Sequence, residues 1–366
     1  MLGNEAIARG AYEAGVKVMS SYPGTPSTEI TEYAARYENI SCEWAPNEKV
    51  ATEVTFGAAM AGVRGMTCMK HVGVNVAADP IFTASYTGVR GGMVIVCADD
   101  PGMHSSQNEQ DSRYYARAAH IPMLEPADSQ ECKDFTKMAF ALSEQFDTPV
   151  FLRLTTRIAH ARSTVVLGAQ EEVSDKTYEK DAMKYVMMPG MAKKRHVVVE
   201  ANMTALAEHA NQLAINHVEM KDSSLGVICS GVTYQYVKEA LPQASVLKLG
   251  MVHPLPKKMI RDFATQVEKL VVIEELEDIV EQQVAAMGVS VEGKNLTGFQ
   301  GELSTKRIKE IFEGTQEKEK NALSDLPSRP PVLCPGCPHR GVFHGLKKLK
   351  LKVMGDIGCY TMGALP

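Results

Sequence analysis

Residues 42–82, CEWAPNEKVATEVTFGAAMAGVRGMTCMKHVGVNVAADPIF, carry the pattern that decides the fold. The short apolar run at 40–44 predicts the end of a strand, and Asn47 is suited to cap the helix that follows, with Glu48 in its first turn. That helix is rich in glycine and alanine, which makes it weak by propensity and indicates close approach by another backbone or a flat cofactor. A second strand at 65–70 then leads into an expected glycine-bearing turn at 71–75. The feature to explain is one carboxylate at the N-terminus of a helix that has a face of small residues.

The same order of strand, turn and helix recurs through residues 1–160, which we expect to form the first domain. The expected strands are 17–21, 40–44, 65–70, 92–98 and 149–154, and the expected helices are 4–14, 47–62, 74–86 and 129–146. Strands that alternate with helices predict a doubly wound, mostly parallel α/β sheet. Ligands of such sheets bind at the carboxyl ends of the strands, where Thr25, Glu48, His71 and the polar loop 99–112 should converge.

The remaining chain divides by composition. Residues 161–195 are polar and are expected to form an arm or linker. A second alternation of helices and strands over 196–313, opening with a helix at 204–217, predicts a second α/β domain. Residues 314–331 are charged and then carry prolines, which is typical of an interdomain linker, and 332–366 begin a third domain.

Composition describes a folded protein of more than one domain. The chain has 366 residues, 45% hydrophobic and 23% charged. A net charge of −5 gives no electrostatic reason to expect nucleic acid or an anionic membrane as a partner. The N-terminus carries Glu5 and Arg9 within a helical pattern and is not a signal peptide, and the apolar runs are too short to span a bilayer. Most of the eight cysteines stand singly in apolar strands, which suits free thiols in the cytoplasm.

Three motifs carry a family resemblance. They are Tyr22-Pro-Gly-Thr-Pro-Ser27, Asn47-Glu-Lys-Val-Ala51 and Lys70-His-Val-Gly-Val-Asn-Val-Ala-Ala-Asp-Pro80. Together they resemble the thiamine-diphosphate-dependent 2-oxoacid:ferredoxin oxidoreductases, over essentially the whole chain. The resemblance implies a pyrimidine-binding thiamine-diphosphate domain, then a transketolase C-terminal-like α/β domain, then the start of a diphosphate-binding domain.

The resemblance also implies a function for Glu48. In the family, the residue at this position contacts the aminopyrimidine N1′ of thiamine diphosphate, which makes Glu48 the expected catalytic residue. From the residues alone, Glu48 also reads as an acidic first-turn side chain favoured by the helix dipole. Further cofactor contacts are expected from the segment after the second strand, at Lys70, His71, Gly73 and Asn75. A lone histidine in such a place is as often a hydrogen-bonded structural group.

The family holds its 2-oxoacid substrate with a threonine and an arginine. Thr25 matches that threonine, and Arg113, just after the polar loop, is the expected arginine. A guanidinium binds a planar carboxylate in a bidentate manner, which suits that function. Arg117 lies one turn further along and is less favoured.

Cysteines near the C-terminus give a metal-like signal. Cys334-Pro-Gly-Cys337, with Cys359 further on, fits tetrahedral zinc or an iron–sulfur cluster, and nearby histidines could complete a zinc site. The resemblance implies that Cys334, Cys337 and Cys359 are metal ligands of a 4Fe-4S cluster whose fourth ligand comes from elsewhere. The family's Mg2+ and diphosphate motif follows later, so the chain is expected to be C-terminally truncated, with Asp356 close to the cofactor.

The activity implied by the resemblance is oxidative decarboxylation of a 2-oxoacid, with coenzyme A taking the acyl group and ferredoxin the electrons. The motifs favour the branch of the family that acts on aryl pyruvates such as indolepyruvate. Two alternatives remain, a pyruvate or 2-oxoglutarate enzyme and a non-catalytic subunit that only binds a partner. The family pairs such chains with a smaller beta (gamma-type) subunit in a dimer of heterodimers.

Overall fold

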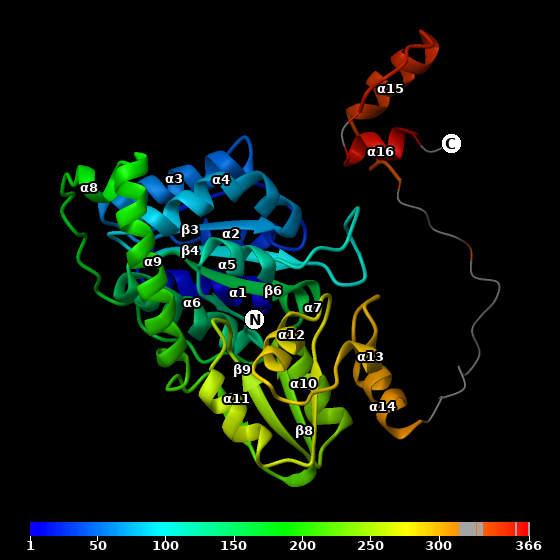
Figure 1. The fold of residues 1–366 in the computed structure, drawn as a ribbon. Helices are drawn as coiled ribbons and strands as arrows, with labels where there is room; N and C mark the ends of the chain where they lie inside the picture. Colours follow the sequence, from blue (N-terminus) through cyan, green and yellow to red (C-terminus); the bar gives the residue numbers. More distant parts are fainter. Residues whose placement is uncertain (315–326, 328–331, 356, 365–366) are drawn as a thin grey trace. The chain divides into compact units, whose positions relative to one another are not determined.

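The computed structural model describes residues 1–314, 327, 332–355 and 357–364 (Figure 1). The chain forms two compact units, Met1–Thr315 and Gln316–Pro366. The larger unit contains two sheets, one of seven strands and one of four.

The seven-stranded sheet has the order β10-β5-β6-β4-β3-β1-β2. All its neighbouring pairs are parallel except the pair of β10 with β5. Its strands are β1 (Val18–Ser21), β2 (Ser41–Trp44), β3 (Gly65–Lys70), β4 (Met93–Asp99), β5 (Met123–Leu124), β6 (Val150–Thr155) and β10 (Met251–His253). The predicted parallel sheet is therefore present, and β3 has the predicted bounds.

Both faces of this sheet are buried, which explains why its central strands are continuously apolar. In β4, Val94 and Val96 belong to one hydrophobic core, while Met93 and Ile95 belong to the other. The helices against the first face are α1 (Gly3–Glu13), α2 (Thr28–Ala34) and α6 (Ser129–Phe146), and those against the second are α3 (Glu48–Ala61), α4 (His71–Thr87) and α5 (Arg113–Ala119). Figure 1 shows α3 and α4 on the opposite side of the sheet from α1 and α6.

One predicted turn is wrong in detail. The segment 71–75 is not a turn, because α4 begins at His71 directly after β3, with Lys70 as its N-cap residue. Helix α2 begins at Thr28, with Ser27 in its N-cap position. The short elements β5, α5 and α7 (Thr156–His160) were not predicted.

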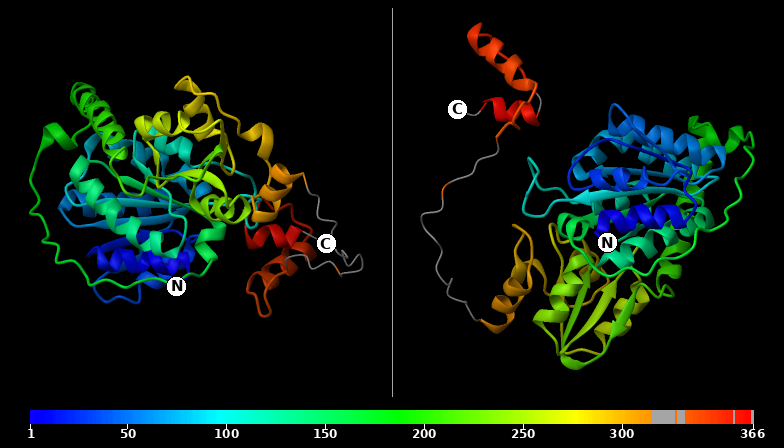
Figure 2. Two further views of the ribbon diagram at one scale, coloured as in Figure 1. Left: turned by 90° about the horizontal axis from the view of Figure 1, so that it is seen from below. Right: turned by 180° about the vertical axis from the view of Figure 1, so that it is seen from behind.

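Residues 161–181 form an extended strap along the larger unit (Figure 2). The strap is held by Arg9, which donates to the Gly168 carbonyl (2.7 Å), and by Arg64, which pairs with Glu171 (3.2 Å). It ends in the short helix α8 (Ala182–Tyr185) and the long helix α9 (Pro189–Ala210). The expected arm or linker at 161–195 therefore ends in helical structure, and the helix expected at 204–217 begins fifteen residues earlier and ends at Ala210.

The four-stranded sheet has the order β11-β8-β9-β7, with β7 antiparallel to β9. Its strands are β7 (His217–Glu219), β8 (Asp222–Ser230), β9 (Ala244–Leu249) and β11 (Lys269–Ile273). Its helices are α10 (Gly231–Ala240), α11 (Lys257–Ala264), α12 (Ile279–Ala286), α13 (Lys294–Thr297) and α14 (Thr305–Glu313). This is the predicted second α/β pattern.

The two sheets share a core, and the strand that follows the second sheet's β9 in the chain belongs to the first sheet. Leu247 and Leu249 of β9 lie in the same hydrophobic cluster as Met123 and Phe151 of the first sheet. Strand β10 follows β9 in the chain but pairs with β5, so the first sheet has an edge built from a segment more than 120 residues away. The sheets are thus parts of one packed body.

The described part of the smaller unit contains α15 (His339–Lys348) and α16 (Cys359–Ala364). The rings of His339, Phe343 and Tyr360 pack against one another, with centroids 5.2 to 5.8 Å apart. Among the residues described in both units, none of the helices has the length and apolar character needed to cross a bilayer.

Candidate functional site

The strand order of the first sheet places a topological switch point between β1 and β3. After β1 the chain continues outward to β2, and it then returns to build β3 and β4 on the other side of β1. Parallel sheets bind ligands in the crevice beyond the carboxyl ends of strands at such a point. The segments that leave β1, β2 and β3 there carry Thr25, Glu48 and His71.

Glu48 is the first residue of α3. Its helix starts there because the side chain of Asn47 accepts a hydrogen bond from the Val50 amide (3.0 Å), as predicted for an N-cap. The Glu48 residue is only 9% exposed, and burial raises the pKa of its carboxyl. Among the described residues, the carboxylate has no side-chain partner and interacts only with its own backbone amide. A carboxylate in this state is suited to bind a proton-bearing group of a ligand.

Gly73 makes the position of Glu48 possible. A Cβ atom added at Gly73 would lie 2.6 Å from Oε1 of Glu48 and 2.7 Å from its Cγ. The carboxylate therefore lies directly against the first turn of α4, where only glycine leaves room for it. The small residues of this stretch allow close approach, as the sequence indicated.

Lys70 and His71 end β3 and begin α4. His71 is 1% exposed, and neither ring nitrogen has a hydrogen-bond partner among the described residues. Burial lowers its pKa, while Asp99 acts in the opposite direction, so the imidazole is neutral at pH 7. Lys70 donates from Nζ to the carbonyl of Ser105, and burial lowers the pKa of its amino group. A buried imidazole with two unpartnered nitrogens needs a ligand or water to complete it.

The loop after β1 lies beside Lys70. A Cβ atom at Gly24 would be 3.2 Å from Cβ of Lys70, and the Gly24 amide donates to Oγ1 of Thr28 (2.9 Å). Thr25 is exposed in this loop. Glu48, Gly73, Lys70 and His71 are thus brought to one edge of the sheet, with the Thr25 loop against them. Asn75 lies further along α4, where it is exposed and accepts a hydrogen bond from Tyr115 (2.5 Å).

The assignment of Arg113 to the substrate carboxylate needs correction. The residue is 2% exposed, and its guanidinium is engaged by Asp111 and Glu274 and by two backbone carbonyls. Asp111 and Glu274 already occupy the positions on the guanidinium that the carboxylate of a 2-oxoacid would need. Arg113 is a structural cation inside the larger unit rather than an open anion receptor.

The cysteine assignment is also unsupported by the geometry. Cys334 and Cys359 are exposed and Cys337 is half-buried, and all three are free. Cys337 has His339 Nδ1 at 3.4 Å from its sulfur. Among the described residues, no group of three or more His, Cys, Asp or Glu side chains is arranged to hold a metal ion. Asp356 lies outside the described residues.

Sequence reasoning missed how the polar loop after β4 takes part in the site. Ser105 reaches Lys70 through its carbonyl oxygen, and the backbone of Asn108 is close enough to His71 to influence its pKa. Backbone groups leave no residue-specific trace in a sequence. The only available signal was the pair Asp99-Asp100 after a strand, whose carboxylates hold the loop in place.

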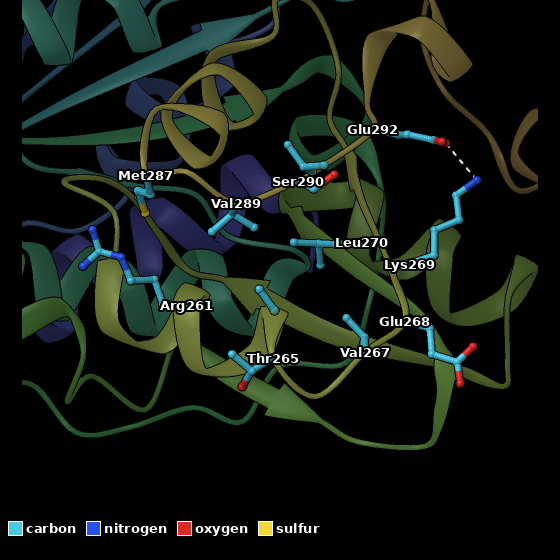
Figure 3. A pocket seen from close by; sticks show the side chains of 12 residues that line it. Arg261, Thr265, Val267, Glu268, Lys269, Leu270, Met287, Val289, Ser290 and Glu292 are labelled. Carbon is cyan, nitrogen blue, oxygen red and sulfur yellow. Dashed lines mark ion pairs between the residues drawn. The ribbon is translucent and has the colours of Figure 1, made fainter.

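A separate cavity of about 570 Å3 lies beside β11 (Figure 3). Figure 3 shows Val267, Leu270 and Val289 around it, with the ion pair of Lys269 and Glu292 (2.8 Å) at one end. None of its lining residues belongs to the edge that carries Glu48.

A buried carboxylate without a side-chain partner among the described residues thus lies at the switch point of a doubly wound sheet, where α/β proteins of this type bind their ligands. The family profile described as "Pyruvate flavodoxin/ferredoxin oxidoreductase, thiamine diP-bdg" matches residues 9–223. The chain therefore belongs to the pyruvate flavodoxin/ferredoxin oxidoreductase family, and the resemblance read from its motifs is confirmed.

Several curated relatives are similar over nearly the whole chain. The indolepyruvate oxidoreductase subunit IorA of Archaeoglobus fulgidus is 42% identical, in an alignment covering 99% of this chain and 64% of the relative. The IorA subunit of Thermococcus kodakarensis is also 42% identical, covering 100% of this chain and 62% of the relative. The 2-oxoglutarate synthase subunit KorA of Methanothermobacter thermautotrophicus is 32% identical but covers 45% of this chain and 46% of the relative. This chain spans a little under two thirds of the length of its IorA relatives.

Solved structures confirm the fold class. A 2-oxoglutarate:ferredoxin oxidoreductase from Magnetococcus marinus superposes with a TM-score of 0.66 at 17% identity, covering 86% of this chain and 64% of that one. A split-gene transketolase gives a TM-score of 0.56 at 15% identity, covering 86% of this chain and 97% of that one. The predicted thiamine-diphosphate-type sheet with a transketolase-like α/β partner is correct.

Proposed function

We propose that this chain supplies the pyrimidine side of the thiamine-diphosphate site in an indolepyruvate:ferredoxin oxidoreductase. The proposed reaction converts an aryl pyruvate and coenzyme A to an aryl acetyl-CoA and carbon dioxide, with the electrons passed to ferredoxin. The names of the IorA relatives support this substrate, and the observation that carries the site is the unpaired Glu48 carboxylate seated on Gly73. A 2-oxoglutarate enzyme is less favoured, because the KorA match covers under half of the chain.

The residues at the switch point fit thiamine diphosphate. The cofactor, when bound, supplies the carbon nucleophile that adds to the 2-oxoacid and stabilises the decarboxylated product. Glu48 would share a proton with the pyrimidine ring nitrogen N1′, and its burial strengthens that hydrogen bond because water competes less for the carboxylate. Gly73 leaves the space against α4 that the carboxylate occupies.

The neighbouring groups would bind the substrate and exclude water. Thr25 lies in the loop beside Lys70 and offers a hydroxyl to the 2-oxoacid. His71, neutral and without a side-chain partner among the described residues, can donate a hydrogen bond from one ring nitrogen and accept one at the other. Lys70 adds a positive charge close to the carboxylate of the substrate.

The rest of the assembly is also part of the proposal. A smaller beta (gamma-type) subunit, ferredoxin and a dimer of heterodimers are expected in the cytoplasm. Mg2+ and the diphosphate group would be held largely by residues beyond those described, with Asp356 near them. Any 4Fe-4S cluster would need ligands besides Cys334, Cys337 and Cys359. We propose the division of the chain into 1–160, 196–313 and 332–366, with linkers between, as the domain plan.

The test compares Glu48→Gln with Glu53→Gln, an exposed carboxylate on the same helix. In the complete enzyme, Glu48→Gln should lower turnover of indolepyruvate by roughly 100-fold or more, since proton transfer by a positioned group contributes about 10²–10⁴-fold. Glu53→Gln should turn over at the wild-type rate. Titration with thiamine diphosphate and Mg2+ establishes whether the wild-type protein binds the cofactor. Full activity of Glu48→Gln would remove this residue from the mechanism.

A further inference from the structure

An interior ion cluster joins the two sheets of the larger unit. It includes Asp99, Asp111, Arg113, Arg153 and Glu274, all of them buried, and Glu125 pairs with Arg153 at 2.8 Å. Arg153 Nε lies 2.7 Å from Asp99, and Arg113 Nη2 lies 2.5 Å from Asp111. On its other side, Arg113 pairs with Glu274, which follows β11 of the second sheet.

The cluster holds both ends of the polar loop at 100–112. Asp99 accepts hydrogen bonds from the amide and hydroxyl of Ser112, at 3.1 and 3.0 Å, which closes the base of the loop. Arg113, the next residue, also donates to the carbonyls of Glu275 and Glu277, at 3.0 and 2.9 Å. The far end of the loop is therefore attached to the second sheet.

The middle of the same loop covers two residues of the candidate site. The Ser105 carbonyl accepts from Nζ of Lys70, and the Asn108 backbone lies close to the His71 ring. Asp100 shapes this part by accepting from the Ser105 amide (2.8 Å) and the Thr156 hydroxyl (2.6 Å). The position of the loop thus sets how deeply His71 is enclosed.

We infer that the second sheet takes part in substrate binding, with Glu274 as a positioning residue that holds loop 100–112 over Lys70 and His71 through Arg113. This inference rests on the proposed function, because it assumes that the 2-oxoacid binds beneath the loop. It adds to that function a contribution from the second α/β domain.

The ion pair of Glu274 with Arg113 can be tested separately from the structural contribution of Glu274. Its carboxylate also caps α12, accepting from the amides of Val280 (3.1 Å) and Glu281 (2.9 Å). In Glu274→Gln the amide oxygen can still accept these bonds, while the negative charge that faces Arg113 is lost. The helix is kept and the attachment of the loop is weakened.

The first measurement is hydrogen exchange on the full chain without added ligand. The amides of Ser105 and Ser112 should exchange about tenfold faster in Glu274→Gln, because the local opening of the loop becomes easier. The control is Ile308→Val, which removes a buried methylene on α14 away from the loop. Unchanged exchange in Glu274→Gln, or an equal increase in the control, would overturn the inference.

The second measurement is steady-state kinetics of the complete enzyme. Glu274→Gln should raise KM for the 2-oxoacid by about fivefold or more with kcat within about twofold, since the loop binds ground and transition states alike. A variant that is merely less stable lowers the active fraction, which reduces kcat and leaves KM unchanged. An unchanged KM would therefore contradict the inference.

A second variant and the cofactor-free exchange measurement keep the inference testable. Should Glu274→Gln fail to fold, Glu274→Asp retains the charge but shortens the side chain, and it is expected to raise KM in the same direction. The exchange measurement needs no cofactor, so it stands even where wild-type protein fails to bind thiamine diphosphate. That failure would remove the proposed function, whereas unchanged loop exchange removes only the inference about Glu274.

Discussion

Gly73→Ala is the most informative single change in the candidate site. The added Cβ would meet Oε1, Cγ and Cδ of Glu48 at 2.6, 2.7 and 2.9 Å. Every one of these atoms belongs to a flexible side chain, so the helix need not unwind. The substitution therefore displaces the carboxylate and leaves the backbone of α4 in place.

The size of the effect follows from these distances. Ordinary contact begins at 3.4 Å, so the carboxylate must move by about 0.8 Å. A displacement of about 1 Å in a catalytic group can cost about 100-fold in rate. For stability, alanine gains about 1 kcal/mol over glycine in a helix, and overpacking costs about 1–3 kcal/mol. The net loss of unfolding free energy should stay within about 2 kcal/mol.

The assay is indolepyruvate turnover by the complete enzyme, together with the affinity for thiamine diphosphate and the Tm. Gly57→Ala is the matched control, because it lies in helix α3 and an added Cβ there meets nothing within 4 Å. The control should keep full turnover and gain a little stability. Full turnover in Gly73→Ala, with the fold intact, would refute the reasoning that Glu48 must lie against this glycine.

Two further predictions concern stability. Burial raises the pKa of Glu275 to about 7 from 4.5, so the stability that its proton contributes is complete below about pH 4.5 and is lost as the pH rises through about 7. In Glu275→Gln the side-chain oxygen can still accept from the Leu303 amide (2.9 Å), but it has no proton to lose. The unfolding free energy of the variant minus that of the wild type should therefore rise by up to about 3 kcal/mol between pH 4.5 and about pH 8. If chemical denaturation shows a difference that does not change with pH, the prediction is contradicted. Asp147 holds Lys184 (2.7 Å) and Arg195 (3.0 Å) of the α8–α9 segment, so Asp147→Asn should lower stability by about 1 kcal/mol or less yet speed proteolysis between residues 176 and 196. Equal cleavage rates in variant and wild type would show that these ion pairs do not fasten the segment.

The first sheet was predictable because its signals are local. Apolar runs of four to seven residues, separated by segments with helical periodicity, predict strands that are buried on both faces. The N-cap at Asn47 was predictable because it depends only on the Asn47 side chain and the residues next to it. The turn expected at 71–75 failed for a non-local reason. Gly73 looked like a turn residue, but it is a helical glycine whose missing side chain makes room for Glu48, which is distant in sequence.

The surroundings of Arg113 could not be predicted for the same reason. Besides the neighbouring Asp111, its partners are Glu274, which is 161 positions away, and backbone carbonyls in the same distant loop. A surface arginine and a buried one have the same local sequence pattern. The two-residue strand β5 was equally hidden, because its pairing depends on a segment that begins at Met251.

The return of Met251–His253 to the edge of the first sheet limits how the protein can be divided. A piece that stops near residue 160 keeps the site residues but uncovers the free edge of β5 and the apolar side chains of Met123 and Phe151. Such an uncovered edge invites pairing between molecules. The piece that carries the site residues is therefore expected to aggregate on its own. It could be separated from the second sheet only if another strand covered the edge of β5.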